Sequence, residues 1–308
     1  LPVPNYDPAA APAAPRMPMA AGGRPCIEMG SRRAHEEAAA AAARAAAIAG
    51  FDSSSNLAAG LRYGITTAGT AAHSFTLLHD DEQAAFEAQV EAMGNQTTLL
   101  VDTYNIEQGI RNAVDVAGPE LAYVRIDSGD LLEEAHHARR LLDDLGNTNT
   151  GIVVTSDLDE YAIAGLRSAP VDSYGVGTQL VTGSGAPTAS LVYKLTTRED
   201  QHGNWIDVQK QAEGKTSRGG RKFAARRMHN NVATAEVVIA DEQPAWDANH
   251  RPLLVQMVTE GEVDSRYTGA AAVRRAAAHH SHTLAELPRD ARRLQAGEPA
   301  IPTIFALH

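Results

Sequence analysis

The chain has 308 residues, of which 44% are hydrophobic, and this is enough for one large α/β domain or two smaller ones. Its 27 basic and 38 acidic residues give a formal charge of −11, which excludes a general electrostatic attraction to nucleic acid or to an anionic membrane, so any phosphate site must be local. The single cysteine, Cys26, cannot form an internal disulfide, and no apolar run reaches the ~18 residues of a membrane span, so we expect a cytoplasmic protein.

Residues 1–21 form a segment rich in proline and alanine, in which prolines recur at intervals of three and four residues from Pro8 to Pro18. Proline removes a backbone donor and clashes with the preceding turn of a helix. The sequence therefore predicts an irregular N-terminal segment over residues 1–21.

Between residues 22 and 194, a short apolar strand leading into a helix recurs as six β/α-type units. Apolar side chains at the helical period, or capping residues at the ends, predict helices over residues 34–49, 82–94, 106–117, 131–145 and 159–169. The strands are nearly continuous apolar runs, which is typical of strands covered on both faces of a parallel sheet. We expect them within "CIEMGSRR", "ITTAGT", "TTLLVDTY", "YVRIDSGD", "GIVVTSDL" and "SYGVGTQLV".

Each of these predicted strands ends in polar residues that can contact a ligand. In a barrel the carboxyl ends of all strands surround one mouth, whereas an open doubly wound sheet gathers ligand groups mainly at its switch point. Both folds satisfy the pattern, and the polar ends of all the strands favour the barrel. We therefore predict an α/β fold with an irregular, incomplete TIM-like (β/α) barrel over residues 22–194.

The pattern changes near Lys194, after which strands are separated by polar loops that contain glycine. Strands are predicted at "SLVYKL", "NWIDVQK", "ATAEVVIA" and "LLVQMV", and a final helix at "AVRRAAAHHSHTLAEL". Residues 195–308 are therefore expected to form a smaller, partial second domain that is rich in β-structure and ends in a helix.

Two stretches contain groups that bind phosphate. Gly177 and Thr178 in "GVGT" follow a strand and offer backbone N–H groups and a hydroxyl, although such turns are also common without a ligand. Arg32 and Arg33 lie at the start of a predicted helix, where cations oppose the helix dipole, so they are either solvated or partners of a bound anion.

Carboxylates follow two further strands. In "RIDSGD", Asp127 can hold Mg²⁺ or sugar hydroxyls and Arg125 can hold a carboxylate or a phosphate, whereas Asp130 is equally well explained as a helix cap. In "TSDLDE" the combination of hydroxyl and carboxylate recurs, with Ser156 and Asp157 as candidate ligand contacts.

Among the histidines, His73 follows "AGT" directly beyond a predicted strand, where a catalytic or ligand-binding group is displayed. Those at 136–137 and 279–282 lie on predicted helices with no carboxylate or cysteine at metal-ligand spacing, and we interpret them as surface residues. From spacing alone, the role of His73 stays open.

Eight motifs occur in the order and spacing in which nicotinate phosphoribosyltransferases carry them. They are "EMGSRRAHE", "GFDSSSNLAAG", "GTAAHSF", "LLVDTY", "VRIDSGDL", "TSDLDE", "YGVGTQLVTG" and "VYKL". The match runs from about Gly22 to "GEPAIPT" near the C-terminus, and a set of ordered motifs is far more specific than any single one. The chain thus resembles this family, particularly its bacterial members.

The resemblance implies a reaction of NAD salvage, in which nicotinate and phosphoribosyl pyrophosphate give nicotinate mononucleotide and pyrophosphate. ATP hydrolysis would be coupled to this reaction through a phosphorylated histidine, and His73 occupies the matching position. The expected partners are therefore nicotinate, phosphoribosyl pyrophosphate and ATP as co-substrate, with Mg²⁺ as the metal. The family fold is an irregular, incomplete α/β barrel with a second α/β domain, usually assembled as a homodimer with sites near the subunit interface.

The resemblance also implies roles for single residues. Thr70 and Arg125 would contact nicotinate, and Asp127 would lie near the ribose and the metal, so that Asp127 and His73 are the predicted catalytic residues. Together with the candidates above, the predicted phosphoribosyl and phosphate contacts are Arg32, Arg33, Ser156, Asp157, Gly177 and Thr178.

Members of the family have a further N-terminal region, with an aromatic residue that stacks on the nicotinate ring, and this chain has no counterpart to it. We expect either a fragment of a longer enzyme or a degenerate copy. Two alternatives to the reaction above stay open. One is a related phosphoribosyltransferase for nicotinamide or quinolinate, and the other is an inactive chain that binds phosphorylated ligands or another subunit.

Overall fold

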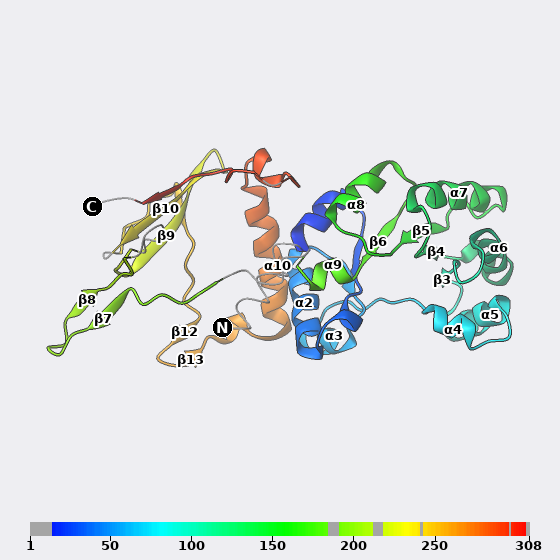
Figure 1. Ribbon diagram of the computed structural model, residues 1–308, viewed down its shortest axis with the longest axis horizontal. Helices are drawn as coiled ribbons and strands as arrows, with labels where there is room; N and C mark the ends of the chain where they lie inside the picture. The colour runs from blue at the N-terminus through cyan, green and yellow to red at the C-terminus, as the bar shows by residue number, and fades with distance from the viewer. Residues whose placement is uncertain (1–13, 184–190, 212–217, 241–242, 296, 306–308) are drawn as a thin grey trace. The chain divides into compact units, whose positions relative to one another are not determined.

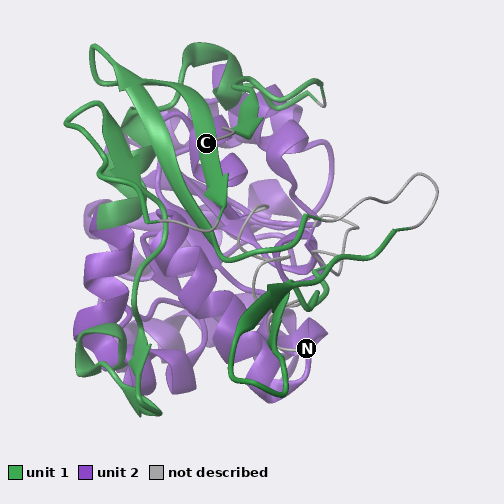
Figure 2. Ribbon diagram, turned by 90° about the vertical axis from the view of Figure 1, so that its left-hand side faces the viewer, with its two compact units in different colours: residues 1, 190–268, 279–308 green, residues 2–189, 269–278 purple. Residues whose placement is uncertain are grey.

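The computed structural model describes residues 14–183, 191–211, 218–240, 243–295 and 297–305 (Figure 1). The chain divides into two compact units (Figure 2). The larger unit consists of residues 2–189 and 269–278, and the smaller unit consists of residue 1 with residues 190–268 and 279–308.

The larger unit is built on a six-stranded parallel sheet with the strand order β2-β1-β6-β5-β4-β3. The strands are β1 (Cys26–Glu28), β2 (Ser53–Ser54), β3 (Thr98–Leu100), β4 (Tyr123–Ile126), β5 (Gly151–Val154) and β6 (Ser173–Val176). Every residue of β5 and β6 is buried, which confirms strands covered on both faces. Because all six strands run in the same direction, their carboxyl ends lie at one edge of the sheet.

The five helices that the sequence predicts are present, together with three short helices that it does not predict. They are α2 (Glu36–Ala49), α3 (Leu57–Tyr63), α4 (His73–Leu77), α5 (Glu82–Met93), α6 (Ile106–Ala117), α7 (Leu131–Asp144), α8 (Glu160–Gly165) and α9 (Thr178–Val181). Short 3₁₀ turns lie at η1 (Ser31–Arg33), η2 (Gly118–Glu120) and η3 (Leu166–Ser168). The capping predictions hold, since the Asp130 carboxylate accepts from the Leu132 and Glu133 N–H groups at the start of α7.

The predicted strand at "ITTAGT" is wrong. Within this stretch only Thr67 takes part in sheet pairing, through an isolated bridge to Ser54, and the edge strand is β2 at Ser53–Ser54 instead. The Ser54 N–H donates to the Thr66 carbonyl, and the Ala68 N–H donates to the Ser54 carbonyl, each at 3.0 Å. With two such bonds and no further ladder, the segment touches the sheet and then leaves it toward His73.

The sheet of the described residues is open, because β2 and β3 each pair with a strand on one side only. The α/β class and the parallel sheet are therefore confirmed, while closure into a TIM-like barrel stays a prediction. None of the helices formed by the described residues is long and apolar enough to cross a membrane.

The N-terminal segment differs from the prediction in its described part. Residues 14–21 are helical, although irregular backbone is predicted over residues 1–21, of which 1–13 lie outside the described residues. Ala14 and Met17 are fully buried, and Ala20 and Ala21 are almost so. Burial of this apolar face outweighs the unfavourable local effect of the prolines, as tertiary packing often does with helix propensity.

The smaller unit contains a four-stranded sheet with the order β11-β9-β10-β14 and two separate two-stranded ribbons. Its elements are β7 (Thr197–Glu199), β8 (Trp205–Asp207), β9 (Lys222–His229), β10 (Val232–Ala240), β11 (His250–Pro252), β12 (Val258–Thr259), β13 (Glu262–Val263), η4 (Ser265–Tyr267), α10 (Gly269–Ala285), η5 (Arg289–Arg292) and β14 (Thr303–Phe305). The β9–β10 hairpin turns at Asn230 and Asn231, whose φ angles of 49° and 62° suit the tight turns that asparagine favours. Helix α10 contributes residues to both units.

Two strand predictions in this part of the chain are wrong. The described residues of "SLVYKL" form no strand, and "LLVQMV" contributes only Val258 to a ribbon. Most large apolar side chains in both stretches are exposed, so little burial stabilises a strand there. The predicted strands at "NWIDVQK" and "ATAEVVIA" and the final helix are confirmed as β8, β10 and α10.

Candidate functional site

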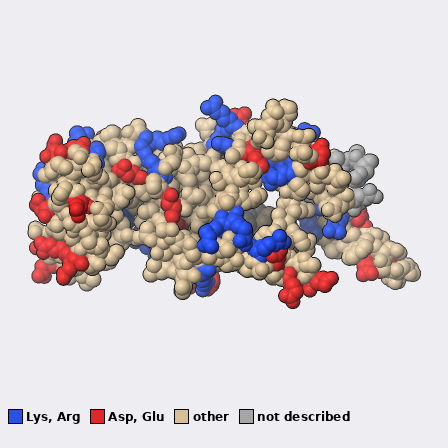
Figure 3. Space-filling view, turned by 180° about the vertical axis from the view of Figure 1, so that it is seen from behind, with Lys and Arg blue, Asp and Glu red and all other residues tan. Residues whose placement is uncertain are grey.

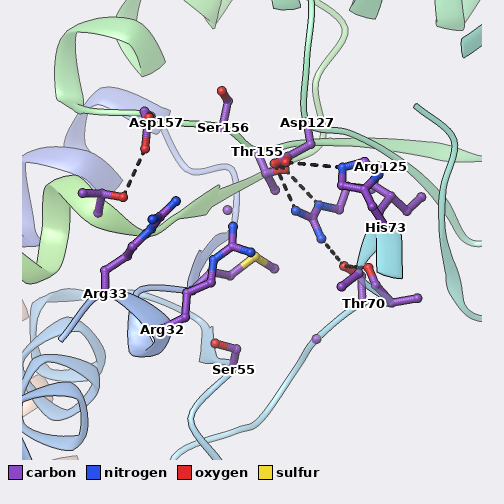
Figure 4. A pocket seen from close by; sticks show the side chains of 18 of the residues that line it. Arg32, Arg33, Ser55, Thr70, His73, Arg125, Asp127, Thr155, Ser156 and Asp157 are labelled. Carbon is purple, nitrogen blue, oxygen red and sulfur yellow. Dashed lines mark hydrogen bonds and ion pairs between the residues drawn. The ribbon is translucent and has the colours of Figure 1, made fainter. Parts of the chain in front are cut away.

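A cavity of about 530 Å³ lies at the edge where the parallel strands of the larger unit end (Figure 4). All ten site residues proposed from the sequence line it, namely Arg32, Arg33, Thr70, His73, Arg125, Asp127, Ser156, Asp157, Gly177 and Thr178. They come from five segments, and each segment lies at the carboxyl end of a strand or just beyond the bridge at Thr67. Their shared location agrees with a single site, while the role of each residue stays a prediction.

His73 is the first residue of α4, and its side chain is 41% exposed at the cavity. Its Nδ1 atom lies 3.2 Å from the Thr103 hydroxyl. Its Nε2 atom lies 3.8 Å from Asp102 Oδ1 and 3.8 Å from Asp127 Oδ2. Two carboxylates on one side of the ring favour a proton on Nε2 and leave the Nδ1 lone pair toward the hydroxyl.

Asp102 directly follows the buried residue Val101 beyond β3, and its side chain is only 1% exposed. Its Oδ2 atom accepts from the Asp127 N–H at 2.8 Å and from the Ser128 hydroxyl at 2.6 Å. Its Oδ1 atom is buried and has no hydrogen-bond partner among the described residues. The aspartate thus orients the loop after β4 with one oxygen and directs the other toward His73.

Arg125 projects from β4 and is held by three side chains (Figure 4). Its Nε donates to the Thr155 hydroxyl at 2.9 Å, and its Nη1 donates to the Thr70 hydroxyl at 2.5 Å. Its Nη2 donates to Asp127 Oδ1 at 3.0 Å. The side chain is 11% exposed, so the guanidinium is largely fixed in place before any ligand arrives.

Asp127 is a carboxylate under opposing influences. Burial by itself raises its pKa, but hydrogen bonds from Thr155 and Arg125, the positive charge of Arg125 and the attraction of His73 in its protonated form hold the pKa below its usual range. The group therefore stays ionised at neutral pH. It can balance positive charge on a bound ligand or help to hold a cation.

The arginine turn, residues 30–33, forms the other side of the cavity. Arg32 and Arg33 in η1 are exposed, and neither side chain has a hydrogen bond or ion pair to any described residue. A Cβ at Gly30 would come within 2.2 Å of Val181 Cγ1, so only glycine lets the turn pack this closely on α9. The turn thus presents two uncompensated positive charges to the cavity.

Glu28, the last residue of β1, holds this turn through hydrogen bonds, and its side chain is fully buried. It accepts from the Gly30 N–H and from the Ser54 hydroxyl, each at 2.5 Å. Burial raises the pKa of Glu28, while these two hydrogen bonds lower it. The carboxyl group joins β1, β2 and the arginine turn.

The loops after β5 and β6 complete the lining. The Thr178 hydroxyl donates to Asp157 Oδ1 at 3.1 Å, which links the two loops. Ser156 has a φ of 119°, a conformation that is costly for a residue other than glycine and that recurs at ligand sites. Gly177 lies against Met29, where a Cβ would be 3.3 Å from the Met29 carbonyl oxygen.

Sequence reasoning assigned no role to three side chains that shape the site, Asp102, Thr103 and Thr155. Each follows a buried strand, so the rule that identified Arg125 and Asp127 also applies to them. What was missing was the pairing between them, because neither the contact of Asp102 with His73 nor that of Thr155 with Arg125 is visible in sequence spacing.

The described residues hold no group of three or more His, Cys, Asp or Glu side chains arranged for a metal ion. Mg²⁺, however, usually takes only one or two carboxylates, with water and substrate phosphates as the other ligands. Asp102 Oδ1, which accepts no hydrogen bond from the described residues, and Asp127 Oδ2 lie close to the same imidazole nitrogen. This pair of hard oxygen donors fits such an ion.

Comparison with known proteins gives a consistent result. No protein-family model matches the chain. It is 53% identical over 309 aligned residues to nicotinate phosphoribosyltransferase pncB1 of Mycobacterium tuberculosis, with 97% of this chain and 67% of the relative covered.

Solved structures agree in fold. The crystal structure of human nicotinic acid phosphoribosyltransferase superposes with a TM-score of 0.74 at 23% identity, over 98% of this chain and 72% of the other. That of nicotinate-nucleotide pyrophosphorylase from Pyrococcus furiosus gives 0.75 at 23% identity, over 92% and 71%. The sequence match and the shared fold point to the same family as the motifs whose residues line the cavity. The chain therefore belongs to the nicotinate phosphoribosyltransferase family.

Proposed function

We propose that the protein is a nicotinate phosphoribosyltransferase, which joins nicotinate to phosphoribosyl pyrophosphate and releases pyrophosphate. Family membership supports this activity. The observation that carries the proposal is the lining of the cavity, where Arg32 and Arg33 lie on one side and Arg125, Thr70 and His73 on the other (Figure 4). Such a cavity accommodates a phosphorylated sugar beside an aromatic acid.

The transfer step needs positioning more than covalent chemistry. The ring nitrogen of nicotinate forms a bond to the anomeric carbon of the ribose, while the bond from that carbon to the pyrophosphate oxygen breaks and pyrophosphate takes the electron pair. Positive charge develops on the ribose, and the ionised Asp127 can balance it. Arg32 and Arg33 would neutralise the leaving pyrophosphate, and Arg125 would hold the nicotinate carboxylate in line.

We further propose that ATP hydrolysis is coupled to this transfer through His73. With the proton on Nε2, the Nδ1 atom attacks the γ-phosphorus of ATP, the bond to the β,γ-bridging oxygen breaks, and ADP leaves. Water later cleaves the phosphorus–nitrogen bond and releases phosphate. Asp102 and Asp127 stabilise the charged ring in this scheme, because each has an oxygen 3.8 Å from Nε2.

Mg²⁺ would be held by Asp102 and Asp127, where it would supply positive charge to the phosphates of the bound substrates. We also propose, from the resemblance alone, that the open sheet is part of an incomplete barrel and that the chain acts in a homodimer. The dispersed surface charge fits a local phosphate site, since basic and acidic side chains are interspersed on the face shown in Figure 3.

The proposed activity is tested by pyrophosphate release from phosphoribosyl pyrophosphate, with and without ATP. Nicotinate, nicotinamide and quinolinate are supplied separately and then in competition. We expect nicotinate to be the preferred base and ATP to accelerate its turnover. Preference for another base would assign the chain to a related reaction, and absence of turnover with retained ligand binding would indicate an inactive binding protein.

His73→Ala tests the coupling. We expect it to abolish phosphorylation of the protein by ATP and the stimulation by ATP, and to leave slow transfer without ATP, because the transfer step itself uses other residues. His279→Ala on α10 is the matched control, since His279 is exposed and lies outside the cavity. Unchanged coupling in His73→Ala would refute the role of this histidine.

A further inference from the structure

Thr155 occupies a central place in the site, although no chemistry has been assigned to it. It directly follows β5, it is 2% exposed, and it lines the cavity. Resting on the function proposed above, we propose that Thr155 is a positioning residue whose hydroxyl orients Arg125 toward the substrate carboxylate and so sets the preference for nicotinate over nicotinamide.

The hydroxyl of Thr155 closes a ring of three hydrogen bonds (Figure 4). It accepts from Arg125 Nε at 2.9 Å and donates to Asp127 Oδ1, and the same Asp127 oxygen accepts from Arg125 Nη2 at 3.0 Å. Because a guanidinium can only donate and an ionised carboxylate can only accept, the direction of each bond in the ring is determined. Threonine supplies both functions that the position between them requires.

This ring decides which part of Arg125 is left for a ligand. The guanidinium has five N–H groups, of which Thr155 and Asp127 occupy the edge formed by Nε and Nη2, and Thr70 accepts one from Nη1. One N–H on each terminal nitrogen then has no partner among the described residues. These two donors are what Arg125 can offer to the two oxygens of a carboxylate.

The same arrangement discriminates against an amide. Nicotinamide presents one oxygen and an NH₂ group to the pair of donors, so that one N–H of Arg125 would face another donor. A site built to satisfy one polar group rejects the analogue that leaves its own groups unpaired. A guanidinium able to turn about its axis could evade this mismatch, and the bond from Nε to Thr155 opposes that rotation together with the bonds to Thr70 and Asp127.

Packing fixes the orientation of Thr155 itself. Its N–H donates to the Ile126 carbonyl of β4 at 2.9 Å. On β6, a Cβ at Gly175 would come within 2.5 Å of Thr155 Cγ2, so the methyl group occupies the space that a side chain at Gly175 would need. With the methyl group held against Gly175, the hydroxyl is directed at Arg125.

Two substitutions separate the hydroxyl from the methyl group. Thr155→Val keeps the shape and removes the hydroxyl, whereas Thr155→Ser keeps the hydroxyl and removes the methyl. Steady-state kinetics of the full chain, with nicotinate and nicotinamide as bases, would measure KM and kcat for each base and KM for phosphoribosyl pyrophosphate. Thr155→Ala is a second variant without the hydroxyl, for use if the valine variant does not fold.

For Thr155→Val we expect the KM for nicotinate to rise about tenfold or more, because one hydrogen bond to a charged group is lost. The ratio of kcat/KM for nicotinate over nicotinamide should fall by a similar factor, while the KM for phosphoribosyl pyrophosphate should change by a smaller factor, since the hydroxyl also donates to Asp127. Thr155→Ser should restore both nicotinate values to within about threefold of wild type. Equal damage from valine and serine, or an unchanged base preference in Thr155→Val, would overturn the proposal.

Calorimetric binding of nicotinate and nicotinamide separates this proposal from the proposed function. If the wild-type chain binds nicotinate but does not turn it over, the transferase activity fails while the role of Thr155 is still decided by binding. Selective loss of nicotinate affinity in Thr155→Val would then support the role, and equal loss for both bases would refute it. A wild-type chain that binds neither base would overturn both proposals.

Discussion

The two sides of the cavity differ in how much of their charge is already paired. On one side, Arg125 is 11% exposed and donates to Thr70, Thr155 and Asp127. On the other side, Arg32 and Arg33 are exposed and have no partner among the described residues. The charges on the Arg125 side are thus paired before a ligand binds, whereas the charges of Arg32 and Arg33 are paired only when an anion binds.

This difference indicates which part of the substrates each side receives. A pre-oriented arginine suits a small, planar acid whose two oxygens have fixed positions. Two uncompensated arginines on a short turn suit phosphate groups, which carry more charge and can accept donors from several directions. His73 and Asp127 lie at the paired side, with Asp127 also bonded to Arg125.

Arg125→Met is expected to have the largest effect. In the proposed reaction it removes the group that binds the nicotinate carboxylate, and it breaks the ion pair between Arg125 and Asp127. Truncating one partner of a buried charge pair costs about 2–5 kcal/mol, so kcat/KM for nicotinate should fall by about 30- to 5000-fold. Arg125→Lys is the control that keeps the positive charge but loses the paired N–H groups of the guanidinium. It should be more active than Arg125→Met but less active than wild type. Full activity in the lysine variant would show that charge alone suffices on this side.

Gly30→Ala tests how the arginine turn is held. The added Cβ would lie 2.2 Å from Val181 Cγ1 and 2.9 Å from the Gly177 carbonyl oxygen, and such overpacking costs about 1–3 kcal/mol of unfolding free energy. Because the turn must move, the KM for phosphoribosyl pyrophosphate should rise as well. Gly165→Ala is the matched control, since a Cβ at Gly165 meets no atom within 4 Å. Similar urea midpoints for the two variants would contradict the tight packing at Gly30.

The smallest expected effect is the dependence of stability on the ionisation of Asp127. Its pKa lies below the ordinary value of 3.8 in the folded protein, so the ionised group stabilises the fold above that value, and this contribution is lost as the pH falls through the lower, folded pKa. Because the site is partly solvated, we expect a difference below about 1 kcal/mol. Urea unfolding between pH 6 and about 3 should show a smaller loss for Asp127→Asn than for wild type, and equal losses would exclude Asp127 as the cause.

The sequence predicts the site better than it predicts the segments around it. Arg125 and Asp127 were identifiable because these polar residues lie at the carboxyl end of a strand and directly after it, and the parallel order of the strands brings such ends together. The partners of these residues were not identifiable, because the hydrogen bond from Arg125 to Thr155 joins positions 30 residues apart and depends on the register between β4 and β5.

Errors in the fold have the same origin in long-range contacts. The helix over residues 14–21 forms because Met17 and its neighbours are buried, which outweighs the local signal of the prolines. Strand β9 was not predicted because adjacent arginines obscure its alternation, and the pairing of Arg226 with Glu236 on β10 compensates one of them. The local sequence pattern thus predicts which side chains lie at the ends of strands. Tertiary contacts determine which of these side chains form hydrogen bonds or ion pairs with one another.

The most direct measurement compares Arg32→Ala with Arg125→Met by steady-state kinetics in which both substrates are varied. If the two sides of the cavity receive different substrates, Arg32→Ala raises the KM for phosphoribosyl pyrophosphate by about tenfold and leaves the KM for nicotinate unchanged. Arg125→Met shows the opposite pattern. The same KM rising in both variants would contradict the division of the cavity into a phosphate side and a nicotinate side.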